Sequence, residues 1–173
     1  MAAAQTATSL APQHADPAAP GHGSVAHTGS AGTMRAAIVS LGGELFTIDL
    51  QNVREVFVVE SITPVPGMPA GLSGVTNLRG SVVPLIDLRQ TIGLAAENAL
   101  KYAVVIKHGN WQVGVLVDTV PEIRTLSKDQ FLPAPVGTGE GGNPFVSTVV
   151  KLEDRLRGVL ETSVVLSHFE GTG

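Results

Sequence analysis

Histidine is the side chain that most often serves as a general base or metal ligand near neutral pH, and this chain has five. His14, His22 and His27 lie at irregular spacing without a carboxylate cluster, so the sequence indicates no metal site there. Nucleophilic catalysis needs a Ser or Thr beside a histidine that a carboxylate holds. His108 and His168 stand in no such motif. We therefore expect no enzymatic activity, no metal and no cofactor.

A second pattern associated with chemistry is the phosphate-binding glycine motif G-x-G-x-x-G, which residues 137–142 match letter for letter. A dinucleotide site needs a strand before this motif and a helix after it. Here Pro133 and Pro135 precede it, and Asn143 and Pro144 follow it. We therefore interpret these residues as a surface loop. The chain also has no cysteine, which excludes disulfides and thiolate metal sites.

The most informative stretch runs from residue 62 to residue 89. Three prolines, Pro64, Pro66 and Pro69, hold its first part extended and predict a surface strap between strands. Residues 77–80 then predict a turn between two apolar strands, because Gly80 is free to take a positive φ. Pro84 lacks a backbone donor, so it predicts that the second of these strands is an edge or carries a bulge.

This stretch resembles the CheW family of chemotaxis coupling proteins. The sequence Gly-Val-Thr-Asn-Leu-Arg-Gly at residues 74–80, followed by apolar-Pro-apolar-apolar-Asp-Leu-Arg at residues 83–89, is characteristic of that family. Residues 53–56, 113–118 and 126–135 also resemble family segments, in the same order. The resemblance spans residues 34–161.

The resemblance implies an all-β fold with short helical turns, in which two intertwined five-stranded SH3-like barrels share one hydrophobic core. It implies a non-enzymatic adaptor in bacterial chemotaxis that links the cytoplasmic tip of a chemoreceptor to the regulatory domain of a CheA-type histidine kinase. The receptor tip is expected in the groove between the barrels. Five residues match the positions associated with receptor coupling: Val53, Glu55, Gly74, Asn77 and Arg79. The kinase contact is expected mainly on the second barrel, and the motifs name no residue for it.

Two other functions remain open from the sequence. One is an adaptor of a chemotaxis-like pathway that controls pilus motility, gliding or development. The other is a sensor that binds a small ligand between the barrels, although a barrel of this size fills its interior with side chains.

Several residues admit both a structural and a functional interpretation. Arg79 could contact a receptor or brace its own turn, since a guanidinium satisfies several carbonyls, and it is placed to pair with Glu55. Gly74 is interpreted as a backbone requirement. Val53 and Val56 are expected to face the core rather than to contact a partner, and Trp111 is expected to be half-buried on a hairpin rather than an interface anchor.

The elements that position these residues are predicted as short strands. Gly42-Gly43 and residues 108–110 predict hairpin turns, and strand-like runs recur at 36–41, 44–50, 72–77, 81–87, 102–107, 111–118, 145–152 and 156–161. Single helical turns are expected at 88–92 and 127–131, the latter with Ser127 as N-cap. Residues 162–169 replace the family's closing helix, which we expect to be short or absent. A faint repeat supports two barrels: residues 46–56 resemble 113–123, and Leu-Arg-Gly at 78–80 recurs at 156–158.

Composition divides the chain into a tail, residues 1–33, a CheW-like domain, residues 34–169, and a flexible end, residues 170–173. The tail has Asp16 as its only charged residue and too little apolar surface to offset its ordering entropy. The net charge of −4 and the absence of a basic stripe argue against nucleic-acid binding. No apolar run is long enough to span a membrane, so we expect a cytoplasmic protein that reaches the inner face of the membrane only through its receptor.

Overall fold

The computed structural model describes residues 32–135 and 142–170. The predicted tail lies outside the described residues except for Gly32 and Thr33, and Thr33 already opens the first strand. The glycine-rich loop likewise lies outside them except for Gly142. Of the predicted flexible end, Glu170 is described, as the last residue of a helix.

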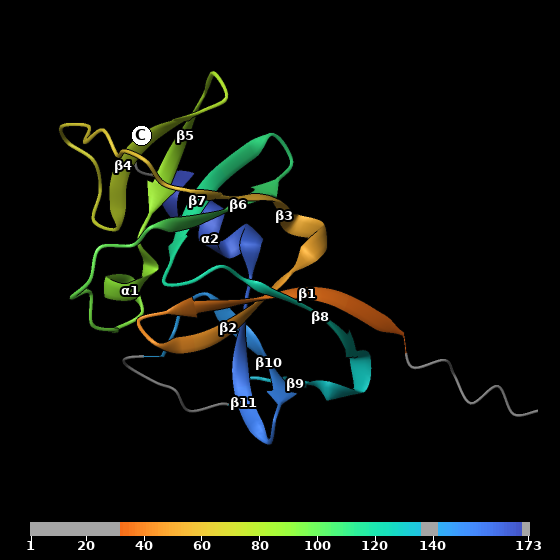
Figure 1. The fold of residues 1–173 in the computed structure, drawn as a ribbon. Helices are drawn as coiled ribbons and strands as arrows, with labels where there is room; N and C mark the ends of the chain where they lie inside the picture. The colour runs from red at the N-terminus through yellow and green to blue at the C-terminus, as the bar shows by residue number, and fades with distance from the viewer. Residues whose placement is uncertain (1–31, 136–141, 171–173) are drawn as a thin grey trace, which may run out of the picture. The chain divides into compact units, whose positions relative to one another are not determined.

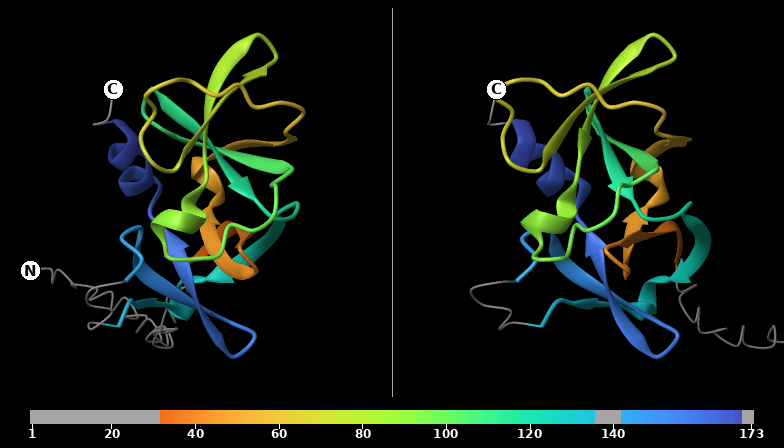
Figure 2. Two further views of the ribbon diagram at one scale, coloured as in Figure 1. Left: turned by 90° about the vertical axis from the view of Figure 1, so that its left-hand side faces the viewer. Right: turned by 60° about the vertical axis from the view of Figure 1, so that its left-hand side comes forward.

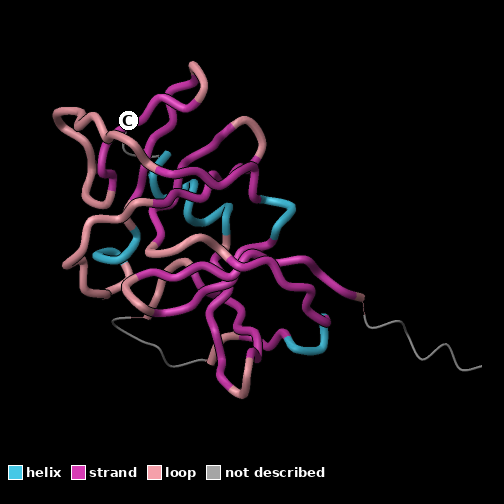
Figure 3. Tube along the Cα trace, in the orientation of Figure 1, coloured by secondary structure: helices cyan, strands magenta, loops and turns pink. Residues whose placement is uncertain are grey.

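The described residues form two sheets that occupy the lower and upper halves of Figure 1 and that strands dominate in Figure 3. The six-stranded sheet contains, in spatial order, β8 (Glu122–Ser127), β1 (Thr33–Leu41), β2 (Glu44–Asp49), β11 (Arg155–Leu160), β10 (Val146–Leu152) and β9 (Phe131–Pro133). The five-stranded sheet contains β3 (Val53–Val58), β6 (Tyr102–His108), β7 (Trp111–Val117), β5 (Ser81–Ile86) and β4 (Leu72–Leu78). The all-β class and the two sheets are as predicted, with β9 as an added sixth strand.

The two sheets repeat one topology. The order β8-β1-β2-β11-β10 corresponds to β3-β6-β7-β5-β4, and each sheet contains one parallel pair, β2 with β11 and β7 with β5. The first half of the predicted repeat is therefore real. The second half is wrong, because Arg79 lies in the β4–β5 turn whereas Arg157 lies within β11. The turn between β10 and β11 contains Glu153 and Asp154, so Glu153 is the counterpart of Arg79.

Three clusters of buried side chains form the core. The interior of the six-stranded sheet is filled by a small cluster around Ile38 and Val150, and that of the five-stranded sheet by one around Leu85 and Leu116. The largest cluster contains residues of both sheets, from Phe46 in β2 to Val115 in β7. The predicted common core is therefore a layer between the two sheets, to which each contributes one face.

Short helices follow β5 and β11. Helix α1 (Leu88–Thr91) begins after Asp87, whose side chain accepts a hydrogen bond from the Arg89 backbone N–H at 3.1 Å. The 3₁₀ turn η2 (Lys128–Gln130) is closed by a capping box with Ser127, so both predicted helical turns are confirmed. A second 3₁₀ turn, η1 (Leu50–Asn52), joins β2 to β3.

The closing helix, which was expected to be short or absent, is present and short. Helix α2 (Thr162–Glu170) is nine residues long and packs against the five-stranded sheet, as the two views of Figure 2 show. Its sequence is rich in β-branched residues, which disfavour helix on their own. Val165 and Leu166 are buried in the shared core, so packing stabilises the helix that local propensity does not predict.

The proline-rich strap closes the five-stranded sheet. The Val59 backbone N–H donates to the carbonyl oxygen of Lys101, the residue just before β6. Thr63 exchanges two backbone hydrogen bonds with Val75 of β4, at 2.8 and 2.9 Å. Gly74 lies directly beneath the strap with φ +147°. A Cβ there would lie 2.5 Å from Thr63 O. Gly74 is thus the point where the backbones of strap and strand touch.

Pro84 was expected on an edge strand or at a bulge. Strand β5 is not an edge, since it lies between β7 and β4, but its pairing with β7 begins only at Leu85, and its pairing with β4 shifts register between Leu72 and Gly74, opposite Ile86 and Leu85. Two other expectations are wrong. Val56 is exposed because β3 alternates strictly and turns Val53, Glu55 and Phe57 inward. Trp111 is 59% exposed and not half-buried.

Asp118 joins the two sheets where the chain leaves β7. Its carboxylate accepts hydrogen bonds from Ser40 Oγ at 2.7 Å and from the backbone N–H groups of Gly42 and Gly43 at 3.1 and 2.8 Å. Both glycines have positive φ and form the β1–β2 turn. Burial alone would raise the pKa of this carboxyl, but the three hydrogen bonds, with help from the Arg89 charge, lower it below its usual value.

We predict that Gly74→Ala destabilises the domain by about 2–4 kcal/mol, because the methyl group adds a backbone clash to the cost of a positive φ. Gly67 is the matched control, since its φ is also positive, +78°, but nothing lies within 4 Å of its Cβ position. Gly67→Ala should cost only about 1 kcal/mol. Urea unfolding of both variants measures the difference, and equal losses would show that the strap does not press on β4.

We predict that Asp118→Asn lowers the free energy of unfolding by about 1–3 kcal/mol at neutral pH. The side-chain amide nitrogen of asparagine cannot accept a hydrogen bond, so one of the backbone N–H groups that now donate to the carboxylate loses its acceptor. Because the folded pKa of Asp118 is depressed, its contribution is complete above its unfolded pKa of about 4 and disappears as the pH falls through the folded value. The difference in free energy of unfolding between wild type and variant should therefore become smaller below about pH 4. Glu97→Gln is the control, because Glu97 is exposed and forms no hydrogen bond or ion pair within the described residues. A difference between wild type and Asp118→Asn that does not change with pH would contradict the assignment.

Candidate functional site

An ion pair closes one end of the five-stranded sheet. Arg79 Nη1 lies 3.1 Å from Glu55 Oε2, so the turn after edge strand β4 meets the opposite edge strand, β3. The predicted pairing of Glu55 with Arg79 is therefore confirmed. The contact is not aligned as a hydrogen bond, which leaves Glu55 Oε2 buried with hydrogen-bonding capacity to spare.

Arg79 occupies an unfavourable backbone conformation. Its φ is +52°, and with Gly80 at +86° it forms the two-residue turn between β4 and β5. Such a turn favours Asn or Gly at this position, and a left-handed conformation costs other residues about 1–2 kcal/mol. The Arg79 side chain is 81% exposed, so its ion pair repays little of that cost. The residue type is therefore not explained by the stability of the turn.

The other three motif residues do not form one contact surface with the Glu55–Arg79 pair. Asn77 Oδ1 accepts a hydrogen bond from the Gly80 backbone N–H at 2.8 Å. Gly74 is buried beneath the strap, as expected for a backbone requirement. Val53 is half-buried against the shared core. Glu55 and Arg79 are thus brought together, Asn77 stands beside them, and Val53 and Gly74 lie elsewhere.

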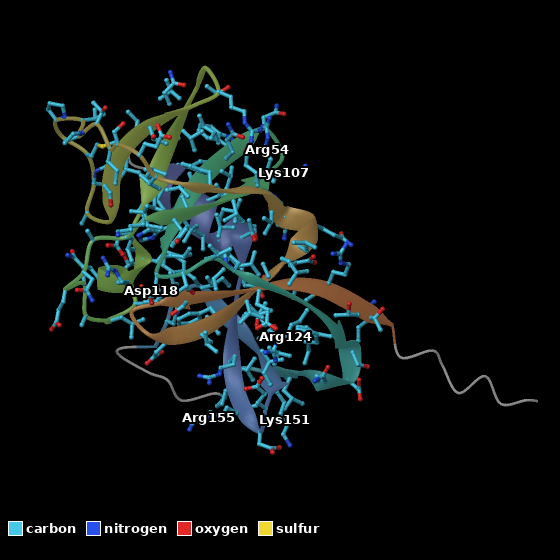
Figure 4. The ribbon with its side chains drawn as sticks, in the orientation of Figure 1. Arg54, Lys107, Asp118, Arg124, Lys151 and Arg155 are labelled. Atoms are coloured by element: carbon cyan, nitrogen blue, oxygen red, sulfur yellow. The ribbon has the colours of Figure 1, made fainter. Side chains whose placement is uncertain are left out.

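Two residues that the sequence did not single out extend the ion pair. Arg54 Nη1 donates to Gln112 Oε1 at 2.8 Å, and Arg54 Nε lies 4.0 Å from Glu55 Oε1. These side chains line a hollow of about 140 Å³ together with Glu55 and Arg79. Arg54 is labelled in Figure 4. The alternation of β3 could have predicted from the sequence that Arg54 is exposed. Gln112 becomes a neighbour of Arg54 only through the pairing of strands that lie far apart in the sequence.

The Asp-Leu-Arg sequence after β5, residues 87–89, has a structural role. Arg89 is buried and binds the Asp87 carboxylate through Nη2 at 2.7 Å and Nε at 3.0 Å, while Nη1 donates to Asn98 O at 3.0 Å. The hydrogen bonds with Asp87 raise the pKa of Arg89 above its usual value. This pair anchors the loop after α1 and is not available to a partner.

The six-stranded sheet contains the counterpart of the closing pair with altered charges. At the position of Arg79 stands Glu153, and Arg124 of β8 bridges it at 2.8 Å to Glu122 at 2.9 Å. These residues and Arg157 line a hollow of about 190 Å³, and Arg124 is labelled in Figure 4. Hydrogen bonds with Glu122 and Glu153 raise the pKa of Arg124, and those with Arg124 lower the pKa of Glu122.

Within the described residues, no three His, Asp or Glu side chains gather as a metal site. Neither helix there has the length and hydropathy of a membrane span.

Comparison with known proteins identifies relatives over most of the chain. The chain is 32% identical over 132 residues to the chemotaxis protein CheW of Rhizobium meliloti, covering 75% of this chain and 85% of that one. It is 30% identical over 138 residues to the CheW of Klebsiella aerogenes, covering 77% and 81%. The protein FrzA of Myxococcus xanthus is 35% identical over 89 residues, which cover 50% of this chain and 56% of FrzA.

A solved structure agrees. The crystal structure of the scaffolding protein TtCheW from Thermoanaerobacter tengcongensis matches with a TM-score of 0.67 at 27% identity, covering 75% of this chain and 89% of that one. Residues 35–170 match the family described as the CheW-like domain. The chain therefore belongs to the CheW-like domain family.

Proposed function

We propose that this protein is a non-enzymatic adaptor of bacterial chemotaxis that couples a chemoreceptor to a CheA-type histidine kinase. The observation that carries the proposal is Arg79, an exposed arginine held in a left-handed turn at the end of one barrel. Backbone strain that brings no stability is typical of a residue retained for binding. The chemotaxis and scaffolding names of the relatives support the same function.

The cytoplasmic tip of the receptor is proposed to bind beside the Glu55–Arg79 pair, at one end of the five-stranded sheet. The regulatory domain of the kinase is proposed to bind the other barrel. Because the shared core holds the two barrels together, both partners would be held in one fixed arrangement. Moderate affinity for each partner suffices, since an array multiplies it through effective concentration. The protein would then reach the membrane only through the receptor.

A related assignment concerns the pathway. The match to FrzA keeps open an adaptor that serves a chemotaxis-like pathway for another kind of motility or for development. A small-ligand sensor is less well supported, because apolar side chains fill the interiors of both barrels.

We predict that Arg79→Gly abolishes receptor coupling while the protein stays folded. Glycine relieves the left-handed backbone and removes one exposed ion pair, so the free energy of unfolding should stay within about 1 kcal/mol of wild type. Loss of the charged contact should weaken binding of a receptor fragment at least about tenfold, equivalent to about 1.4 kcal/mol. Calorimetric titration with the receptor fragment and urea unfolding measure the two effects.

Arg35→Glu is the control, because Arg35 is an exposed arginine of β1 in the other sheet. It should bind the receptor fragment like wild type. Kinase binding by Arg79→Gly, measured by co-purification, should be unchanged. If Arg79→Gly binds the receptor fragment normally, Arg79 only braces its turn and the proposed site is wrong.

A further inference from the structure

Trp111 stands on the opposite face of the five-stranded sheet from the Glu55–Arg79 pair. Successive residues of β7 point to opposite faces, so Gln112 faces the closing pair whereas Trp111 and Val113 face helix α2. Gln112 also lines a hollow beside Trp111, but no other residue that lines the hollow of the Glu55–Arg79 pair does so, and the feature is otherwise distinct from the proposed receptor site.

Two hollows flank Trp111 along α2, and we call them together the Trp111 groove. One measures about 360 Å³ and is lined by His108, Trp111, Val164, Leu166 and Glu170, with Ser163 and Ser167. The other measures about 100 Å³ and is bounded by Trp111, Pro84, Leu72 and Phe169, with Gln112, Val113, Leu166 and Glu170. Trp111, Leu166 and Glu170 line both.

The floor of the groove is apolar and partly uncovered. Trp111 is 59% exposed and Val164 is 41% exposed. Tryptophan is the residue most often found at the energetic centre of a protein interface, because its large rigid surface binds at low entropic cost.

Charge identifies what would cover this floor. Glu170 lines both hollows, and it forms no ion pair within the described residues. It ends α2, where the last backbone carbonyls and the helix dipole add partial negative charge. The indole face also attracts cations. No lysine or arginine of the described chain lines either hollow. Three attractors for a cation therefore meet at an apolar floor that no described lysine or arginine lines.

We propose that the Trp111 groove binds an apolar segment of another protein that carries a lysine or arginine, with the cation between Glu170 and Trp111. The apolar side chains of the segment fill the two hollows, and its charge compensates the end of α2. This would be a docking surface in addition to those for receptor and kinase.

The test uses intrinsic fluorescence, because Trp111 is the single tryptophan of the chain. The full-length protein is titrated with a synthetic helical peptide that has leucine on one face and lysine on the other. Its counterpart has glutamate in place of lysine. We expect a saturable blue shift of the Trp111 emission with the lysine peptide, and binding at least about tenfold weaker with the glutamate peptide.

Glu170→Gln should weaken binding of the lysine peptide about three- to tenfold, as removal of one partner of a partly desolvated charge pair does. Glu97→Gln removes the same charge from an exposed site elsewhere and should bind like wild type, which excludes general attraction to an acidic protein. Trp111→Ala, followed by calorimetry, should bind the lysine peptide at least about tenfold more weakly.

Equal binding of the two peptides, or equal affinities in Glu170→Gln and Glu97→Gln, would overturn the proposal. So would an unchanged Trp111 emission at saturation. A receptor fragment that displaces the lysine peptide would show that the groove belongs to the receptor site, which also overturns it as a separate surface. Failure of the Arg79→Gly prediction leaves these outcomes unaffected, because that residue lies on the other face.

Discussion

The apolar layer between the two sheets is the constraint on which the rest of the structure depends. Each barrel has only a small interior cluster of its own, whereas the largest cluster takes side chains from both sheets and from α2. A barrel separated from its partner would expose this layer to water, at about 25 cal/mol for each Å². The two barrels must therefore fold together. Their outer surfaces keep one fixed arrangement, which a protein that positions two partners requires.

The path of the chain strengthens this layer. The first hairpin, β1–β2, belongs to one sheet, the next five strands belong to the other, and β8 returns to the first. Helix α2 follows a strand of the six-stranded sheet but packs on the five-stranded one. Asp118 and Arg89 lie where the halves meet, the first holding the β1–β2 turn and the second the loop after α1. Polar side chains at this junction form hydrogen bonds with backbone groups that would otherwise have no partner where two segments of the chain cross.

Features encoded by neighbouring residues could be predicted from the sequence, and those that depend on distant pairing could not. Glycine pairs and prolines marked the hairpins and the strap, because they restrict or free the backbone at their own position. Strands β3, β8 and β9 were missed, since β3 and β8 are edge strands that carry charged residues and β9 has only three residues. The exposure of Val56 and Trp111 depends on which element covers each face. In the site, the Glu55–Arg79 pair followed from family position, whereas Arg54 and Gln112 required the actual register of β3, β6 and β7.

The two barrel ends show how one topology can present two different surfaces. At the equivalent turn position one barrel has Arg79 and the other has Glu153. The strand residue near this turn is a glutamate in both barrels, Glu55 in one and Glu122 in the other. The second barrel therefore has two carboxylates close together, those of Glu122 and Glu153, and Arg124 lies between them. Arg124 forms its hydrogen bonds with both acids of its own barrel, whereas the side chain of Arg79 is mostly exposed to solvent. Two ends that are alike in backbone therefore differ in the charge they offer, and a partner that recognises the exposed guanidinium of Arg79 can bind only one of them.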